Sequence, residues 1–235
     1  MRVRFCTAVV AAAAWLGCLP SPASAQDWTE YVNKEDGFSV NFPGQPQVRE
    51  ITWPSEYGLT FAGRVYSAQR GAERYTVTVV DYRDAEQKYH AVSRPPSFQQ
   101  AIYWQIDIMG SIQYAATKLF RQRPGVKVHY DAWHYIDLVE GHMLHLANAD
   151  QSVTHASIYL HENRLYVLEG TVPPGAPEPG LFTQSLGFLD ADGQRVRYRE
   201  IYSNRLPPMT MGNRVGGGGR GGGGQGGAPD QRQQR

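Results

Sequence analysis

Three short segments near the middle of the chain alternate apolar and polar residues, and they restrict the fold more than any other feature. They are residues 142–147, 153–161 and 164–171. If Ala147 pairs with Val153, the large apolar side chains of the first two segments share one face, whereas a shift of one residue would scatter them over both. This pairing also places His145 directly opposite His155. The pattern therefore predicts antiparallel strands with one buried face.

The loop between the second and third segments, Glu162-Asn163, has the length of a tight hairpin turn. A hairpin closed by this turn places Tyr159 opposite Tyr166 on one face and Leu160 opposite Leu165 on the other. We therefore expect these segments to be hairpin-linked strands of one sheet.

A long amphipathic helix is predicted over about residues 97–121. Ser97 follows two prolines and precedes Gln100 by three residues, which is a capping-box pattern. Apolar side chains then recur at spacings of three and four residues, as in a helix that faces a core. They are Ala101, Trp104, Ile108, Ile112, Ala115 and Leu119. Pro124-Gly125 ends the pattern.

Further strands are expected on both sides of this helix. They are residues 37–43, 48–53, 60–68 and 74–82 before it, and 126–130, 133–139 and 194–202 after it. A short helix is predicted over about 181–189, after a proline-rich loop. Hairpin-linked strands around one long helix indicate an α+β fold with a central antiparallel β-sheet.

Residues 1–25 are typical of a secretory signal peptide. Arg2 and Arg4 precede an apolar stretch of about a dozen residues, the usual length of such a leader. Ala23 and Ala25 form the A-x-A pattern of a cleavage site, so the mature chain is expected to begin at Gln26. The pattern predicts export, with the periplasm as the favoured compartment and secretion as an alternative.

Two other interpretations of the leader stay open: a buried N-terminal helix, and a lipoprotein acylated at Cys18, for which Trp15 is unusually bulky. Removal of the leader takes both cysteines, Cys6 and Cys18, with it. The mature chain would then have no disulfide, no thiolate nucleophile and no cysteine-ligated metal site.

Charge and glycine content divide the rest of the chain in two. Residues 26–204, expected to form a single domain, carry 16 basic and 21 acidic residues, a net charge of −5. Residues 205–235 carry five arginines and one aspartate, a net charge of +4, and 11 of the 25 glycines lie in the last 24 residues. A segment with so little to bury is expected to be a disordered tail.

The tail could act as a flexible spacer or as a weak electrostatic tether to anionic envelope surfaces. A nucleic-acid partner is not expected, because Arg220 is the single arginine inside the glycine run and no aromatic residue accompanies it. A membrane span is not expected either, because no apolar run reaches the roughly 18 residues that one requires.

Two stretches resemble a large set of exported bacterial proteins, most of them without an assigned function. Residues 37–46, GFSVNFPGQP, resemble their GFSV-x-FPG-x-P opening, and residues 156–166, ASIYLHENRLY, resemble their RIYLVGNRLY hairpin. That set is similar in layout to the PsbP-like fold, an α/β/α sandwich with helices on both faces of an antiparallel sheet. The resemblance covers about residues 28–190 and implies fold and export, but its motifs carry no catalytic residue.

The chain has seven histidines, and six of them invite a metal site because imidazole is a common transition-metal ligand. They are His129, His134, His142, His145, His155 and His161. His155 and His161 stand about 20 Å apart along one strand and cannot share an ion. His145 and His155, with Cβ atoms about 5 Å apart, are the candidate ligands, and they need a third ligand from elsewhere. The alternative is a set of half-exposed strand histidines.

The sequence contains no P-loop, G-x-S-x-G, H-E-x-x-H or dinucleotide-binding motif, and no cofactor is expected. Asp131, Asp137 and Glu140 are candidate carboxylates for a hydrolase, but each suits a solvated loop as well. The sequence therefore favours a non-enzymatic, exported accessory or binding protein with a protein or small-molecule partner. The alternatives are a metal-handling protein or hydrolase that uses His145 and His155, and an envelope protein tethered by the tail.

Overall fold

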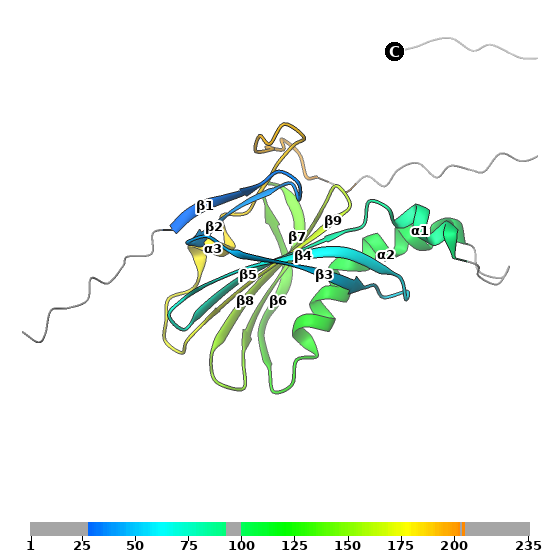
Figure 1. Cartoon of the computed structure of the whole chain (residues 1–235). Helices are drawn as coiled ribbons and strands as arrows, with labels where there is room; N and C mark the ends of the chain where they lie inside the picture. The colour runs from blue at the N-terminus through cyan, green and yellow to red at the C-terminus, as the bar shows by residue number, and fades with distance from the viewer. Residues whose placement is uncertain (1–27, 93–99, 203, 205–235) are drawn as a thin grey trace, which may run out of the picture.

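The computed structural model describes residues 28–92, 100–202 and 204 of the chain. Within them, seven antiparallel strands form the larger sheet, in the order β3-β4-β5-β9-β8-β7-β6 (Figure 1). These strands are β3 (Gln47–Pro54), β4 (Thr60–Arg70), β5 (Glu73–Asp81), β6 (Lys127–Ile136), β7 (Val139–Ala147), β8 (Val153–His161) and β9 (Arg164–Val172).

A smaller sheet and a few helices complete the described part. The smaller sheet has the order β1-β2-β10, and its strands are β1 (Trp28–Asn33), β2 (Phe38–Pro43) and β10 (Gly187–Phe188). The helices are α1 (Ala85–Ala91), α2 (Gln100–Ala115), the π-helix η1 (Ala116–Arg121) and α3 (Gly180–Thr183). The α+β class is confirmed.

The predicted register of the central strands is confirmed. Ala147 pairs with Val153, which places His145 opposite His155. Tyr159 pairs with Tyr166 across the β8–β9 turn. Both turn residues, Glu162 and Asn163, have positive φ angles, as a two-residue hairpin turn of this kind requires. The apolar pattern of the strands therefore determined their pairing.

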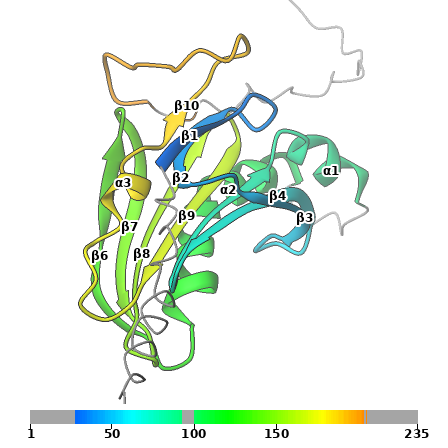
Figure 2. The same ribbon diagram turned by 60° about the vertical axis from the view of Figure 1, so that its left-hand side comes forward.

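The larger sheet carries a separate apolar core on each face. Trp104, Ile108 and Ile112 of α2 pack on one face, where Leu144 and Ile158 of the sheet are fully buried. The smaller sheet and α3 cover part of the other face, as Figure 2 shows. The layer opposite α2 is thus made of short strands and a single helical turn.

The long predicted helix is confirmed from Gln100 to Arg121, as α2 followed by η1. Its predicted start at Ser97 lies outside the described residues, as do the predicted leader and the predicted tail. In the part of the chain that is described, no helix is both long enough and apolar enough to cross a membrane.

The short helix predicted over 181–189 is wrong in its extent. One turn forms, from Gly180 to Thr183, and the chain then becomes extended so that Gly187 and Phe188 pair with β2. The Ser185 hydroxyl also accepts a hydrogen bond from the amide of Asn41, at 2.8 Å. The free edge of β2 thus competes for this segment more strongly than helix formation does.

Two strand predictions after the long helix also differ from the structure. The predicted strands 126–130 and 133–139 are one strand, β6, with a bulge between Val128 and Tyr130. The strand predicted over 194–202 is reduced to isolated bridges at Arg195 and Tyr202. Single backbone hydrogen bonds, from Val196 to Phe188 and from Tyr202 to Leu138, hold this segment together with the rings of Tyr198 and Tyr202, which pack against His161.

Candidate functional site

The predicted histidine pair acquires a third neighbour in the structure. His145 on β7 and His155 on β8 face each other with ring centroids 4.3 Å apart. Glu178, from the loop 173–179, approaches both rings, and the potential ligand atoms of the three side chains all lie within 4.8 Å of one another. His155 is buried, His145 is half-buried and Glu178 is exposed. Two histidines and a carboxylate thus converge from three segments.

Two histidines on this face of the sheet, His155 and His134, have lowered pKa values. Burial lowers the pKa of His155, the neighbouring His145 lowers it further, and Glu178 partly opposes the change. Burial and His145 also lower the pKa of His134. This residue lies on β6, on the same face of the sheet as His145. Neutral imidazole offers a free lone pair, which is the form that binds a metal ion or accepts a hydrogen bond.

His142 lies on the opposite face of β7 and has partners of its own. Its Nε2 donates to the carboxylate of Asp131, and its Nδ1 lies 3.3 Å from the side-chain amide of Gln113, where it can accept a hydrogen bond. Arg121 binds the same carboxylate at 2.7 and 2.9 Å. The guanidinium of Arg121 and then His142 lower the pKa of Asp131 to about 2, against the effect of burial. This network ties the end of the long helix to β6 and β7.

His161 belongs to an aromatic cluster at the other end of β8. Its ring stacks on Phe188 at 4.4 Å, lies 4.7 Å from Tyr202, and its Nε2 is 2.7 Å from the hydroxyl of Tyr198. Burial, with a smaller contribution from Arg164, lowers the pKa of His161 to about 4. His161 therefore holds the segment 188–202 against the sheet and, as the sequence predicted, is distant from His155.

The three candidate carboxylates do not form a catalytic pair. Asp131 binds Arg121 and His142, whereas Asp137 binds Arg195 and Arg197 at 3.2 and 2.6 Å. Glu140 is exposed beside the β6–β7 turn. Asp131 and Asp137 are thus occupied by structural ion pairs.

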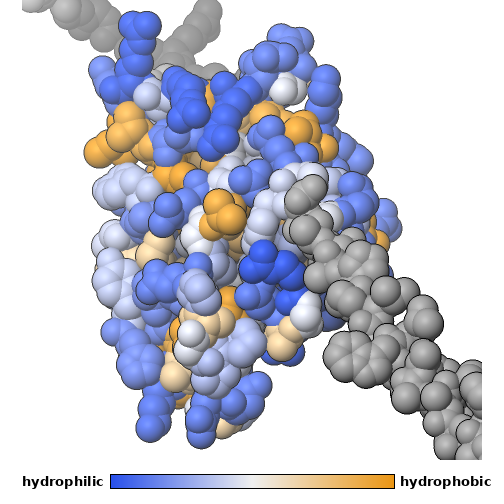
Figure 3. Space-filling view, turned by 90° about the vertical axis from the view of Figure 1, so that its left-hand side faces the viewer, coloured by the Kyte–Doolittle hydropathy of each residue, from blue (hydrophilic) through white to orange (hydrophobic). Residues whose placement is uncertain are grey.

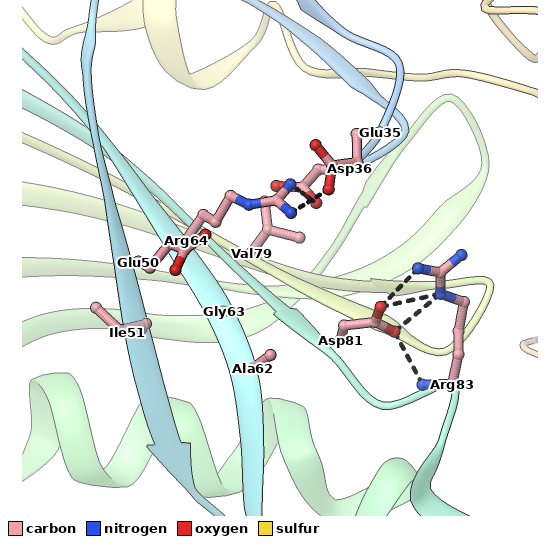
Figure 4. A pocket seen from close by; sticks show the side chains of 10 residues that line it. All are labelled: Glu35, Asp36, Glu50, Ile51, Ala62, Gly63, Arg64, Val79, Asp81 and Arg83. Atoms are coloured by element: carbon pink, nitrogen blue, oxygen red, sulfur yellow. Dashed lines mark hydrogen bonds and ion pairs between the residues drawn. The ribbon is translucent and has the colours of Figure 1, made fainter.

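A charged cavity of about 180 Å³ lies between the β1–β2 turn and strands β3, β4 and β5 (Figure 4). At one end Arg64 binds Glu35 and Asp36, and at the other end Arg83 binds Asp81 at 2.6 and 2.9 Å. Figure 4 shows the two ion-paired groups, with Ala62 and Gly63 preceding Arg64 along β4. Because both arginines that line the cavity are already paired with carboxylates, the cavity offers little free positive charge to an anionic ligand.

Large exposed apolar side chains gather along β6. Tyr130, Trp133 and Tyr135 are 43%, 57% and 44% exposed, although all three belong to a strand. Trp133 and Tyr135 share the face of Asp131, and Tyr130 shares the face of His145. On the side of the molecule shown in Figure 3, hydrophobic residues occur as separate patches in a hydrophilic surface.

Two features of this region were missed in the sequence. Glu178 gave no signal, because a loop with four prolines has no periodicity that predicts where it will lie. The exposure of the aromatic residues of β6 was not predicted, although residues 126–130 and 133–139 were expected to form strands. These residues are exposed because β6 is the last strand of the larger sheet. The order of strands in a sheet cannot be predicted from the alternation of residues within one strand.

Comparisons with protein-family models and with curated proteins found no match. The solution structure of cyanobacterial PsbP from Synechocystis sp. PCC 6803 is similar to this chain with a TM-score of 0.36 and 11% sequence identity. That similarity covers 67% of this chain and 86% of the other. The α+β assignment of this chain rests on its own sheets and helices.

Proposed function

We propose that this chain is an exported accessory protein that binds an extended segment of a partner protein along β6. The observation that carries the proposal is the exposure of Tyr130, Trp133 and Tyr135 on a strand that is last in its sheet, as far as the described residues go. Tryptophan and tyrosine are the residues most often found at the energetic centre of protein interfaces. The leader pattern of residues 1–25 supports export.

The geometry of β6 suits the addition of one further strand. After the bulge between Val128 and Tyr130, the strand pairs regularly with β7 up to Ile136, so about seven residues have an uninterrupted backbone. Aromatic rings flank this edge on both faces of the sheet, Trp133 on one and Tyr130 on the other. An added strand would receive main-chain hydrogen bonds from the edge and ring contacts for its alternating side chains.

The rings are also held in place before any partner arrives. Trp133 meets His142 edge-on at 5.6 Å, and Tyr130 lies 5.1 Å from His145. Side chains that are already ordered lose less conformational entropy on binding.

The opposite edge of the sheet differs in composition. β3 carries Arg49 and Glu50 in its middle and ends in Pro54. Charged residues and proline on an edge strand hinder pairing with another strand. We therefore assign binding to β6 and not to β3.

Site-specific photocrosslinking in cells tests this proposal. A photoreactive residue in place of Trp133 is expected to yield a crosslinked partner protein in the exported fraction. The matched control is the same replacement at Leu181, which is 61% exposed but lies on α3, far along the chain from β6. N-terminal sequencing of the mature protein should start at Gln26 if export follows the leader.

Two outcomes would overturn the proposal. One is an equal yield of the same crosslinked species from positions 133 and 181, which would indicate nonspecific contact. The other is a crosslinked species at position 133 that contains two copies of this chain and no other protein, since the surface would then serve self-association.

A further inference from the structure

The side chains of His145, His155 and Glu178 lack the partners that occupy the other buried histidines. His142 and His161 each bind another side chain through a ring nitrogen. Across residues 28–92, 100–202 and 204, by contrast, no hydrogen bond or ion pair is found to the ring nitrogens of His145 and His155, or to the carboxylate of Glu178. His155 is 7% exposed, and a ring nitrogen that no protein group binds is free to take up a ligand.

A specific packing arrangement brings Glu178 to the two histidines. His155 pairs with Gly170 on the neighbouring strand β9. A Cβ atom at Gly170 would stand 2.9 Å from the ring of Pro179, which is buried against this position. The missing side chain at Gly170 thus makes room for Pro179, and Pro179 fixes the preceding residue, Glu178, above the pair.

The loop around Glu178 is stiff for its length. Pro177 and Pro179 flank Glu178, and Pro173 and Pro174 begin the same loop. Proline fixes φ and restricts the residue that precedes it, so the loop loses little entropy when its carboxylate is held in one place. The third ligand that the histidine pair requires is therefore supplied by a segment of limited freedom.

We propose that His145, His155 and Glu178 bind one divalent transition-metal ion of the zinc or copper type. Two imidazoles and one carboxylate form a donor set that suits these ions, and three protein ligands leave at least one position open for water or a small anion. Metal–ligand bonds of about 2.0–2.2 Å place two ligand atoms at most about 4.4 Å apart, so a pair at the present limit of 4.8 Å has to move slightly closer. His145 and Glu178 have the exposure to do so. This inference is independent of the proposed partner surface on β6.

Isothermal titration of the untagged mature chain with zinc sulfate, and separately with copper sulfate, tests the site. We expect one ion to bind per chain for at least one of the two metals. His145→Ala and Glu178→Gln each remove one ligand at an accessible position, and each is expected to weaken binding at least about tenfold. The matched control is His90→Ala, which removes an exposed histidine from α1 and is expected to leave binding unchanged.

The thermal midpoint of each variant without metal establishes that the variant is folded, so that a loss of binding cannot be ascribed to unfolding. The same concentration of metal should raise the midpoint of the native chain more than that of Glu178→Gln. The proposal fails if the native chain gives no heat with either metal, or if His145→Ala binds as tightly as the native chain. It fails equally if His90→Ala weakens binding as much as His145→Ala does.

Discussion

The two faces of the larger sheet are both buried, but with different kinds of side chain. Along β8, Ala156, Ile158 and Leu160 point toward α2, whereas His155 and Tyr159 point toward the smaller sheet and the loops. A long helix covers the first face with a continuous apolar stripe. The second face is covered by a short sheet, a single helical turn and a proline-rich loop.

The two covers differ in the room that they leave for a ligand beside the sheet. A helix buries its sheet face evenly, and such a face tolerates few polar groups unless they pair, as His142 does with Asp131. A cover made of loops and short strands leaves gaps where polar side chains can remain buried and still meet a ligand. The candidate ligands His145 and His155 lie on that second face. The face opposite the helix is therefore where we expect binding.

The largest change in stability is expected from the substitution of Gly141, which lies on this second face. A Cβ atom at Gly141 would overlap both the ring of Tyr159 and the carbonyl oxygen of Ile158 on the paired strand. The backbone oxygen cannot move aside without disturbing the ladder, so Gly141→Ala is expected to lower the free energy of unfolding by roughly 3 kcal/mol. Urea denaturation measures the change.

Tyr159→Leu in the Gly141→Ala background provides the control. A smaller side chain at position 159 relieves the overlap with the ring, and part of the lost free energy of unfolding should return. If Gly141→Ala were as stable as the native chain, the close packing of this face would contribute nothing to the free energy of unfolding.

The sequence predicted the elements whose structure depends on their own residue pattern. It did not predict those whose structure depends on contacts with distant parts of the chain. The pairing of His145 with His155 was predicted, because alternation along β7 and β8 permits one register that gathers the apolar side chains. Strand β1 was missed, since few of its side chains are buried and its pattern is weak. The helix predicted over 181–189 includes β10, which is a strand because its two residues pair with the edge of β2.

Part of the candidate metal site could be predicted from local sequence patterns, and part of it could not. Two of its proposed ligands belong to adjacent strands, and strand parity places them correctly. The third, Glu178, depends on Pro179 packing at Gly170, a contact between residues on separate segments that has no counterpart in any local pattern. The burial of His155 was also unforeseen, because the loop that covers it follows β9 in the chain.

An intermediate effect is expected from the titration of His161. Its pKa falls from 6.5 in the unfolded chain to about 4 in the folded protein, so the unfolded chain binds the proton more readily as the pH drops. The stabilisation is complete above pH 6.5 and is lost as the pH falls from about 6.5 to 4. Over this range the native chain should lose about 2–3 kcal/mol more of its free energy of unfolding than His161→Phe does, measured by urea denaturation at pH 7 and pH 4.

Tyr198→Phe separates the titration of His161 from its hydrogen bond. It removes the hydroxyl that lies 2.7 Å from Nε2 but leaves the imidazole buried against Phe188. Its stability should therefore depend on pH as steeply as that of the native chain. If His161→Phe keeps the full native dependence on pH, the acid sensitivity arises elsewhere.

The smallest effect, of opposite sign, is expected from the same glycine-to-alanine change on the helix side. Gly110 lies in the middle of α2, and the nearest atom that an added Cβ would meet is Oε2 of Glu56, at an ordinary contact distance of 3.5 Å. Alanine restricts the unfolded chain and favours the helix, so Gly110→Ala should raise the free energy of unfolding by about 0.5–1 kcal/mol. Urea denaturation beside Gly141→Ala measures both changes. A loss of stability at Gly110 would mean that the helical cover is packed as tightly as the second face, and the contrast between the two faces would not hold.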